Sequence, residues 1–158
     1  MTLAEAVRSC FRNYVKFSGR ASRSEFWWFA LVVFACSLVS LALVETFGLP
    51  GKVLLFWLLL LFPLVSVGYR RLHDVDLEGH LFPFALVSIA VPVRLLAAPV
   101  NLSEHVKLDL SLVSGPPLTW LAILFAHMAA GLLIIRQMIL PSDPETNHFG
   151  PNPNEVPQ

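Results

Sequence analysis

The stretch FWWFALVVFACSLVSLALVETF, residues 26–47, decides the fold class of this chain. A single acidic residue, Glu45, interrupts its apolar run close to the end. About 20 consecutive apolar residues are enough for a helix to cross the hydrocarbon core of a bilayer. A helix on the surface of a soluble protein would instead carry a polar stripe with a period of about 3.6 residues. The stretch therefore predicts a transmembrane helix.

Three more apolar segments follow along the chain, at residues 53–69, 81–100 and 118–140. The first of these is short, but Lys52 and Arg70 flank it, and long basic side chains extend toward the membrane surfaces. The second contains several prolines, so a kinked or re-entrant helix is the alternative to a straight span. Together the segments predict an all-α membrane protein with four transmembrane helices, in a single membrane domain over residues 1–158.

The composition supports a membrane protein and excludes several other classes. Hydrophobic residues make up 56% of the chain, charged residues make up 14%, and the mean hydropathy is +0.67. Because soluble domains contain about a quarter charged residues, these values exclude a disordered chain, a coiled coil and an ordinary soluble enzyme. The sequence has no phosphate-binding loop, dinucleotide fingerprint, zinc-protease motif or nucleophile elbow. We therefore expect no cofactor and no nucleic-acid partner, and we favour a binding role over catalysis.

The distribution of basic residues predicts the orientation in the membrane. With four spans, the N-terminus, the loop around residues 70–80 and the tail at 141–158 share one side. That side carries eight basic residues, whereas the other carries Lys52 and Lys107. Because cytoplasmic loops are enriched in Lys and Arg, both termini are expected in the cytoplasm. The eight residues are Arg8, Arg12, Lys16, Arg20, Arg23, Arg70, Arg71 and Arg136.

Residues 3–17 have the pattern of an amphipathic helix that lies on a membrane surface. Basic residues recur every four positions, at Arg8, Arg12 and Lys16. Apolar residues recur at helical spacing on another face, at Leu3, Val7, Cys10, Phe11, Tyr14 and Phe17. This pattern predicts an interfacial helix on the inner leaflet, with the lipid bilayer and its anionic phospholipids as partners.

Polar motifs occur at three positions on the predicted cytoplasmic side: before the first span, between the second and third spans, and after the fourth. In a compact bundle these positions are neighbours, so we expect them to form one polar cap. Arg20, Arg23, Arg70 and Arg71 are the candidates to hold an anion, since guanidinium groups bind phosphate and carboxylate through two parallel hydrogen bonds. Glu25 and Asp74 are expected to orient the arginines, and His73 is expected to make the site pH-sensitive.

Each candidate also has a simpler interpretation. The arginines alone suffice to set topology and contact headgroups. Glu25 fits a capping box that begins at Ser22, and a salt bridge from Glu25 to Arg70 or Arg71 is the alternative. The run at residues 73–80 contains metal-ligating side chains, but a solvated turn is favoured over a metal site.

Three motifs carry a family resemblance: GRASRSEFWW at 19–28, RRLHD at 70–74 and NHFGPNP at 147–153. On these motifs the chain resembles the domain-of-unknown-function 805 family, the YhaI-like inner-membrane proteins. The resemblance implies a small bacterial inner-membrane protein with four spans, and it implies no activity. The chain departs from the family pattern after Asp74: members usually have a small residue, a glycine and a tryptophan further along, whereas this chain has Glu78-Gly79-His80-Leu81.

Three alternative functions stay open beside an anion-binding module. A small oligomeric transporter or channel subunit would use His127 and Arg94 within its spans. A membrane enzyme would act through Glu25, His73 and Asp74. A structural partner in a larger complex would need the arginines for topology alone. The four-residue spacing of Ala122, Ala126 and Ala130 favours close helix packing or a homo-oligomer.

Overall fold

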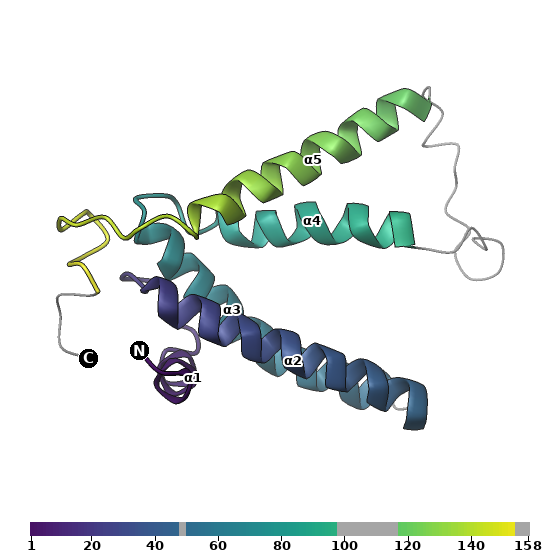
Figure 1. Cartoon of the computed structure of the whole chain (residues 1–158), viewed down its shortest axis with the longest axis horizontal. Helices are drawn as coiled ribbons and strands as arrows, with labels where there is room; N and C mark the ends of the chain where they lie inside the picture. Colours follow the sequence, from purple (N-terminus) through teal and green to yellow (C-terminus); the bar gives the residue numbers. More distant parts are fainter. Residues whose placement is uncertain (48–49, 98–116, 154–158) are drawn as a thin grey trace. The chain divides into compact units, whose positions relative to one another are not determined.

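The computed structural model describes residues 1–47, 50–97 and 117–153 (Figure 1). Within these ranges the chain forms helices and no β-strand, which confirms the predicted all-α class. Residues 147–150 form an isolated bridge. The helices are α1 (Leu3–Arg12), α2 (Arg23–Phe47), α3 (Pro50–His73), α4 (Leu81–Ala97) and α5 (Pro117–Gln137).

Each of the four predicted spans coincides with a helix, from α2 to α5, although residues 98–100 of the third span lie outside the described residues. Among the described residues, one helix, within Arg23–Ser40 of α2, is both long and apolar enough to cross a membrane. Only 28% of that stretch is buried inside the protein, so most of its apolar surface points outward. Shorter apolar stretches lie at Leu81–Ala90 and Leu121–Gln137. Membrane crossing by the other three helices stays a prediction.

The chain divides into two compact units, residues 1–82 with 137–158, and residues 83–136. In the first unit α2 and α3 run antiparallel and side by side, and α1 packs against both (Figure 1). The Ala21 amide donates a hydrogen bond of 2.9 Å to the Arg70 carbonyl, which joins the start of α2 to the end of α3. The buried apolar side chains here include Phe26, Phe29, Val67, Leu72 and Phe82.

A glycine allows a close approach between α3 and Phe82 in this core. The ring of Phe82 packs edge-on against Phe26, with ring centroids 5.7 Å apart. A Cβ atom on Gly68 would lie 2.2 Å from the Phe82 ring. Real Cβ atoms do not approach so closely. The lack of a side chain at position 68 therefore allows the Phe82 ring to pack directly against the backbone of α3.

The first helix is shorter than the sequence pattern predicts, because it ends at Arg12 and not at residue 17. Its start is a capping box in which the Thr2 hydroxyl and the Glu5 carboxylate each accept the other's backbone N–H. At the other end the Asn13 side chain donates to the Ser9 carbonyl. The Ser66 hydroxyl then lies 2.8 Å and 2.7 Å from the carbonyls of Asn13 and Lys16, so tertiary hydrogen bonds replace the next helical turn.

In the second unit a glycine again permits close helix packing. A Cβ on Gly131 of α5 would lie 2.8 Å from the Ile89 side chain of α4. The neighbouring Ala122 and Ala126 are exposed, so a homo-oligomer that uses them stays a prediction. His127 is also exposed, and its Nδ1 lies 2.9 Å from the Ile123 carbonyl one turn earlier.

Candidate functional site

The three polar motifs come together in the first unit. Beyond the bond from Ala21 to Arg70, the Asp143 amide donates to the Asp74 carbonyl at 3.0 Å. The Asn147 side chain donates to the His73 carbonyl at 2.9 Å. These contacts tie the tail after α5 to the end of α3. We call this assembly the polar cap: Arg20, Glu25, Arg70, Arg71, His73, Asp74 and the tail at residues 138–153.

Asp74 lies at the centre of the polar cap and is shared by two arginines. Its Oδ1 accepts from Arg20 Nε at 2.9 Å, and its Oδ2 accepts from Arg71 Nη1. The side chains of Asp74 and Arg71 are fully buried. Burial lowers the pKa of Arg71, and the charge of Asp74 acts in the opposite direction. A buried charge of this kind persists only when paired and hydrogen-bonded.

The remaining donors of Arg20 and Arg71 bind the backbone of the tail. Arg20 Nη2 donates at 2.5 Å to the Asp143 carbonyl, and Arg71 Nε donates at 3.0 Å to the Met138 carbonyl. Further tail carbonyls that accept from these two guanidinium groups belong to Leu140, Glu145 and Gly150. Internal acceptors therefore occupy the two arginines, which act in this structure as positioning residues for the cap.

A second ion pair joins α2 to α3. Arg70 Nη2 lies 3.0 Å from Glu25 Oε1, one of the two partners expected for Glu25. The same oxygen accepts from the Ser9 hydroxyl at 3.0 Å and from the Cys10 thiol at 4.0 Å. Burial raises the pKa of Cys10 to about 12, and the charge of Glu25 adds to the effect, so the thiol stays protonated. The Ser22 hydroxyl accepts from the Glu25 amide, which gives α2 a capped start as well.

The guanidinium group of Arg70 has a buried N–H donor without a partner among the described residues. Its Nε atom is buried and has no hydrogen-bond partner in the part of the chain that the structure describes. The side chain is only 5% exposed, so water does not replace a partner freely. Buried donors are paired in the great majority of cases, and an unpaired donor on a charged group is costly.

A polar pocket of about 310 Å³ has Arg70 in its lining. Its walls come from α1 and the turn after it, from Glu25 and Arg70, and from the end of the tail. Four basic side chains and one acidic side chain line it. Two of the basic residues, Arg12 and Lys16, are exposed and form no ion pair with another described residue. The lining is Ser9, Arg12, Asn13, Lys16, Ser18, Gly19, Arg20, Glu25, Arg70, Phe149, Gly150, Pro151 and Pro153.

His73 helps to fix the tail. Its ring stacks on Phe149, with centroids 3.9 Å apart and an angle of 2° between the planes. Its Nδ1 lies 3.1 Å from the Gly19 carbonyl. Burial lowers the pKa of His73, which favours the neutral ring with Nδ1–H as the donor. Since Asp74 is occupied by the two arginines, the described contacts do not couple His73 to a carboxylate as an acid–base pair.

The candidate metal ligands within residues 73–80 form two separate pairs of side chains. Asp76 lies 3.3 Å from His148, and Glu78 lies 3.9 Å from His80, with all four side chains exposed. Within the described ranges no three His, Cys, Asp or Glu side chains come together.

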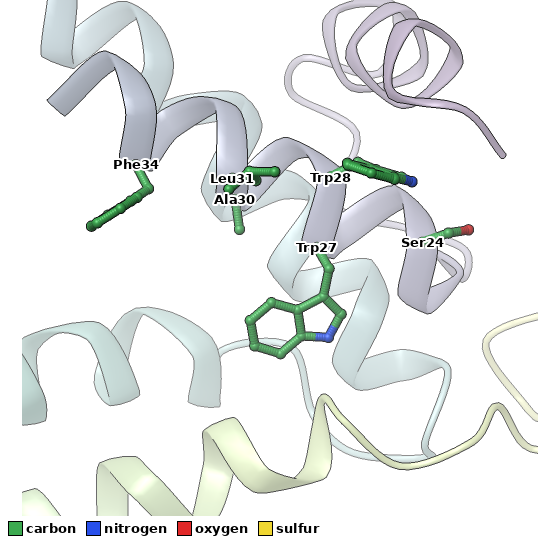
Figure 2. Close-up of a pocket in the computed structure, with 6 residues that line it drawn as sticks. All are labelled: Ser24, Trp27, Trp28, Ala30, Leu31 and Phe34. Atoms are coloured by element: carbon green, nitrogen blue, oxygen red, sulfur yellow. The ribbon is translucent and has the colours of Figure 1, made fainter. Parts of the chain in front are cut away.

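A larger groove of about 580 Å³ lies along α2 (Figure 2). Its lining contains no titratable side chain, and the Trp27 and Trp28 side chains project from α2 in different directions. A groove of this composition suits apolar neighbours rather than ionic chemistry. The lining consists of Ser24, Trp27, Trp28, Ala30, Leu31 and Phe34.

The chain is similar to known proteins over most of its length. The sequence profile described as "Protein of unknown function (DUF805)" matches residues 14–151. The chain belongs to the DUF805 family. The Inner membrane protein YhaI of Escherichia coli K12 and that of Escherichia coli O157:H7 are each 37% identical to this DUF805 chain over 73 residues. The match covers 45% of this chain and 62% of each relative, which is less than two thirds of their length. No solved structure matches.

The motifs of this DUF805 protein divide between scaffold and pocket. Arg71, His73 and Asp74 hold the tail, Glu25 and Arg70 line the pocket, and Arg20 does both. Arg23 is exposed, lies outside the pocket lining, and forms no ion pair among the described residues. Sequence reasoning missed Arg12 and Lys16 as pocket residues, because it assigned both to the basic face of an interfacial helix.

Proposed function

We propose that this DUF805 protein is a multi-pass inner-membrane protein that binds a phosphate or carboxylate group in the pocket of its cytoplasmic polar cap. The name of the E. coli relatives and the family membership support the inner membrane. The excess of basic residues beside the cap supports a cytoplasmic location. The large apolar side chains that α2 and α3 expose support contact with lipid, for example Leu31, Phe34 and Phe62.

The observation that carries the proposal is that Arg70, whose buried Nε has no partner among the described residues, lines a polar pocket. An oxyanion in the pocket would accept from this donor. Arg12 and Lys16, which have no ion-pair partner in the described structure, would supply further charge at the rim. Charge-assisted hydrogen bonds to arginine are among the stronger interactions available to a small anion. The Glu25 carboxylate prevents an excess of positive charge and sets the orientation of Arg70.

Two sources of such an anion fit the position of the pocket. Four exposed apolar side chains in and after α1, Leu3, Phe11, Val15 and Phe17, support an interfacial position for this segment. The Tyr14 hydroxyl also donates to the Leu59 carbonyl of α3, inside the second predicted span. An interfacial position favours a phospholipid headgroup. A small phosphorylated or carboxylated molecule from the cytoplasm is the other source.

Removing the rim charges is expected to weaken anion binding while the fold is retained. We expect the R12Q/K16Q variant to lose about tenfold in affinity, because two charged donors at the pocket are replaced. Native mass spectrometry of the full chain in detergent would follow adducts with phosphatidylglycerol, phosphatidylcholine and inorganic phosphate. Lipid as the source predicts a specific phosphatidylglycerol adduct, and a small anion predicts a phosphate adduct.

The matched control is R8Q/R23Q, which removes the same charge from exposed positions outside the pocket lining. It should keep the adduct of the wild type. Equal losses in both double variants would show that total charge governs binding, which would contradict the pocket. The absence of any anionic adduct would favour a structural role in a larger complex.

A further inference from the structure

The tail at residues 138–153 is held to the first unit mainly by polar contacts. Five of its backbone carbonyls accept from Arg20 and Arg71. Among the described tail residues, Met138 and Asn152 are the buried side chains, and regular structure is limited to the bridge at 147–150. Segments that bury little apolar surface open at lower free energy than a packed core. Local opening of the tail is therefore expected to require less free energy than unfolding of α1, α2 and α3.

The same tail forms one wall of the anion pocket. Phe149, Gly150, Pro151 and Pro153 line the side of the pocket that the tail contributes. Phe149 reaches this position by stacking on His73 at the end of α3. Arg20 belongs to both structures, since it lines the pocket and donates to the tail carbonyls. Detachment of the tail would leave the Arg70 side open to water.

We infer that tail docking and anion binding are coupled, so that the docked tail completes the anion site and a bound anion holds the tail in place. This inference rests on the proposed function, because it concerns the same pocket. Water exclusion by the tail wall strengthens the attraction between the anion and Arg70. Coupling between two equilibria is reciprocal, so each must stabilise the other by the same factor. Whether the tail is docked on the cytoplasmic side then depends on whether the pocket holds an anion.

Hydrogen exchange of the full chain in detergent measures the first half of this coupling. The Asp143 amide donates to the Asp74 carbonyl when the tail is docked, and the Asn147 and Gly150 amides form the bridge within the docked tail. With inorganic phosphate or phosphatidylglycerol at about ten times its dissociation constant, their exchange should slow about tenfold, because binding depletes the open state. The R12Q/K16Q variant, with its weakened site, should show a much smaller change at the same concentration.

The F149A variant measures the second half. Loss of the stack on His73 and of one pocket wall is expected to raise tail exchange and to weaken anion binding about threefold to tenfold, by the same factor in both measurements. The control is T146A, which changes an exposed tail residue outside the pocket lining. It should bind like the wild type.

The possible results separate the inference from the proposed function. If the wild type binds the anion, but F149A binds equally well and the anion leaves tail exchange unchanged, the coupling is wrong and the pocket stands. If the wild type binds neither inorganic phosphate nor phosphatidylglycerol, both proposals fall. Slower tail exchange on addition of the anion, with a matching loss in F149A, supports both.

Discussion

The D74N variant is expected to lower the midpoint of thermal unfolding by about 10 °C or more, which corresponds to a loss of about 3–5 kcal/mol. Asp74 is the one carboxylate that pairs with both Arg20 and Arg71 in the described structure, and all three side chains are buried. An Asn amide would present a donor where two guanidinium groups require an acceptor. Removal of one partner from a buried ion pair leaves the other charges uncompensated.

The measurement is the loss of monodisperse protein on heating in detergent. D76N is the matched control, since Asp76 is exposed and its backbone has a positive φ of 58° that asparagine adopts readily. The control should remain within about 2 °C of the wild type. A D74N midpoint equally close to the wild type would contradict the central role of Asp74. Should D74N fail to accumulate, R20K tests the same network with a smaller change.

The E25Q variant is expected to have opposite effects on stability and on binding. Without an anion it should lose about 3 kcal/mol of stability, because Arg70 then keeps a buried charge without its carboxylate. With inorganic phosphate it should regain much of that loss, since the pocket has lost its negative charge and Arg70 has gained a free Nη2 donor. The expected gain in anion affinity is about tenfold.

The test compares phosphate-induced shifts of the unfolding midpoint in E25Q and in the wild type, with the phosphatidylglycerol arm run in nanodiscs. E78Q is the control, because Glu78 is an exposed acid outside the pocket lining. A phosphate-induced shift in E25Q no larger than that of the wild type would show that the anion does not interact with Arg70. A larger shift in E78Q as well would point to a general effect of ionic strength.

Much of the architecture follows from the sequence because hydrophobic length and charge position are local signals. The apolar runs predicted the positions of α2, α3, α4 and α5. The clustering of the cap motifs was expected from the predicted order of four spans, and the pair between Glu25 and Arg70 was one of the two expected. The predicted end of α1, at residue 17, was wrong, because the helix ends at Arg12. There Ser66, more than fifty residues away, hydrogen-bonds to the backbone that follows the helix.

The division of labour among the arginines was not predictable. Arg20 and Arg71 bind backbone carbonyls of the tail. Because every residue carries such a carbonyl, no side-chain pattern in the sequence indicates which residues accept these bonds. Arg20 and Arg23 stand three residues apart, yet one is buried in the cap and the other is exposed. Burial of this kind depends on where the tail returns, and that is a property of the folded chain.

Anion binding at Arg70 is tested most directly by observing the Arg70 Nε–H group itself. Nuclear magnetic resonance of the full chain with ¹⁵N-labelled arginine resolves the side-chain Nε–H signals, and R70K identifies the one that belongs to Arg70. We predict that inorganic phosphate or phosphatidylglycerol shifts this signal, whereas those of Arg20 and Arg71, already bonded to Asp74 and to the Met138 carbonyl, stay in place. An unmoved Arg70 signal at saturating anion would contradict the account.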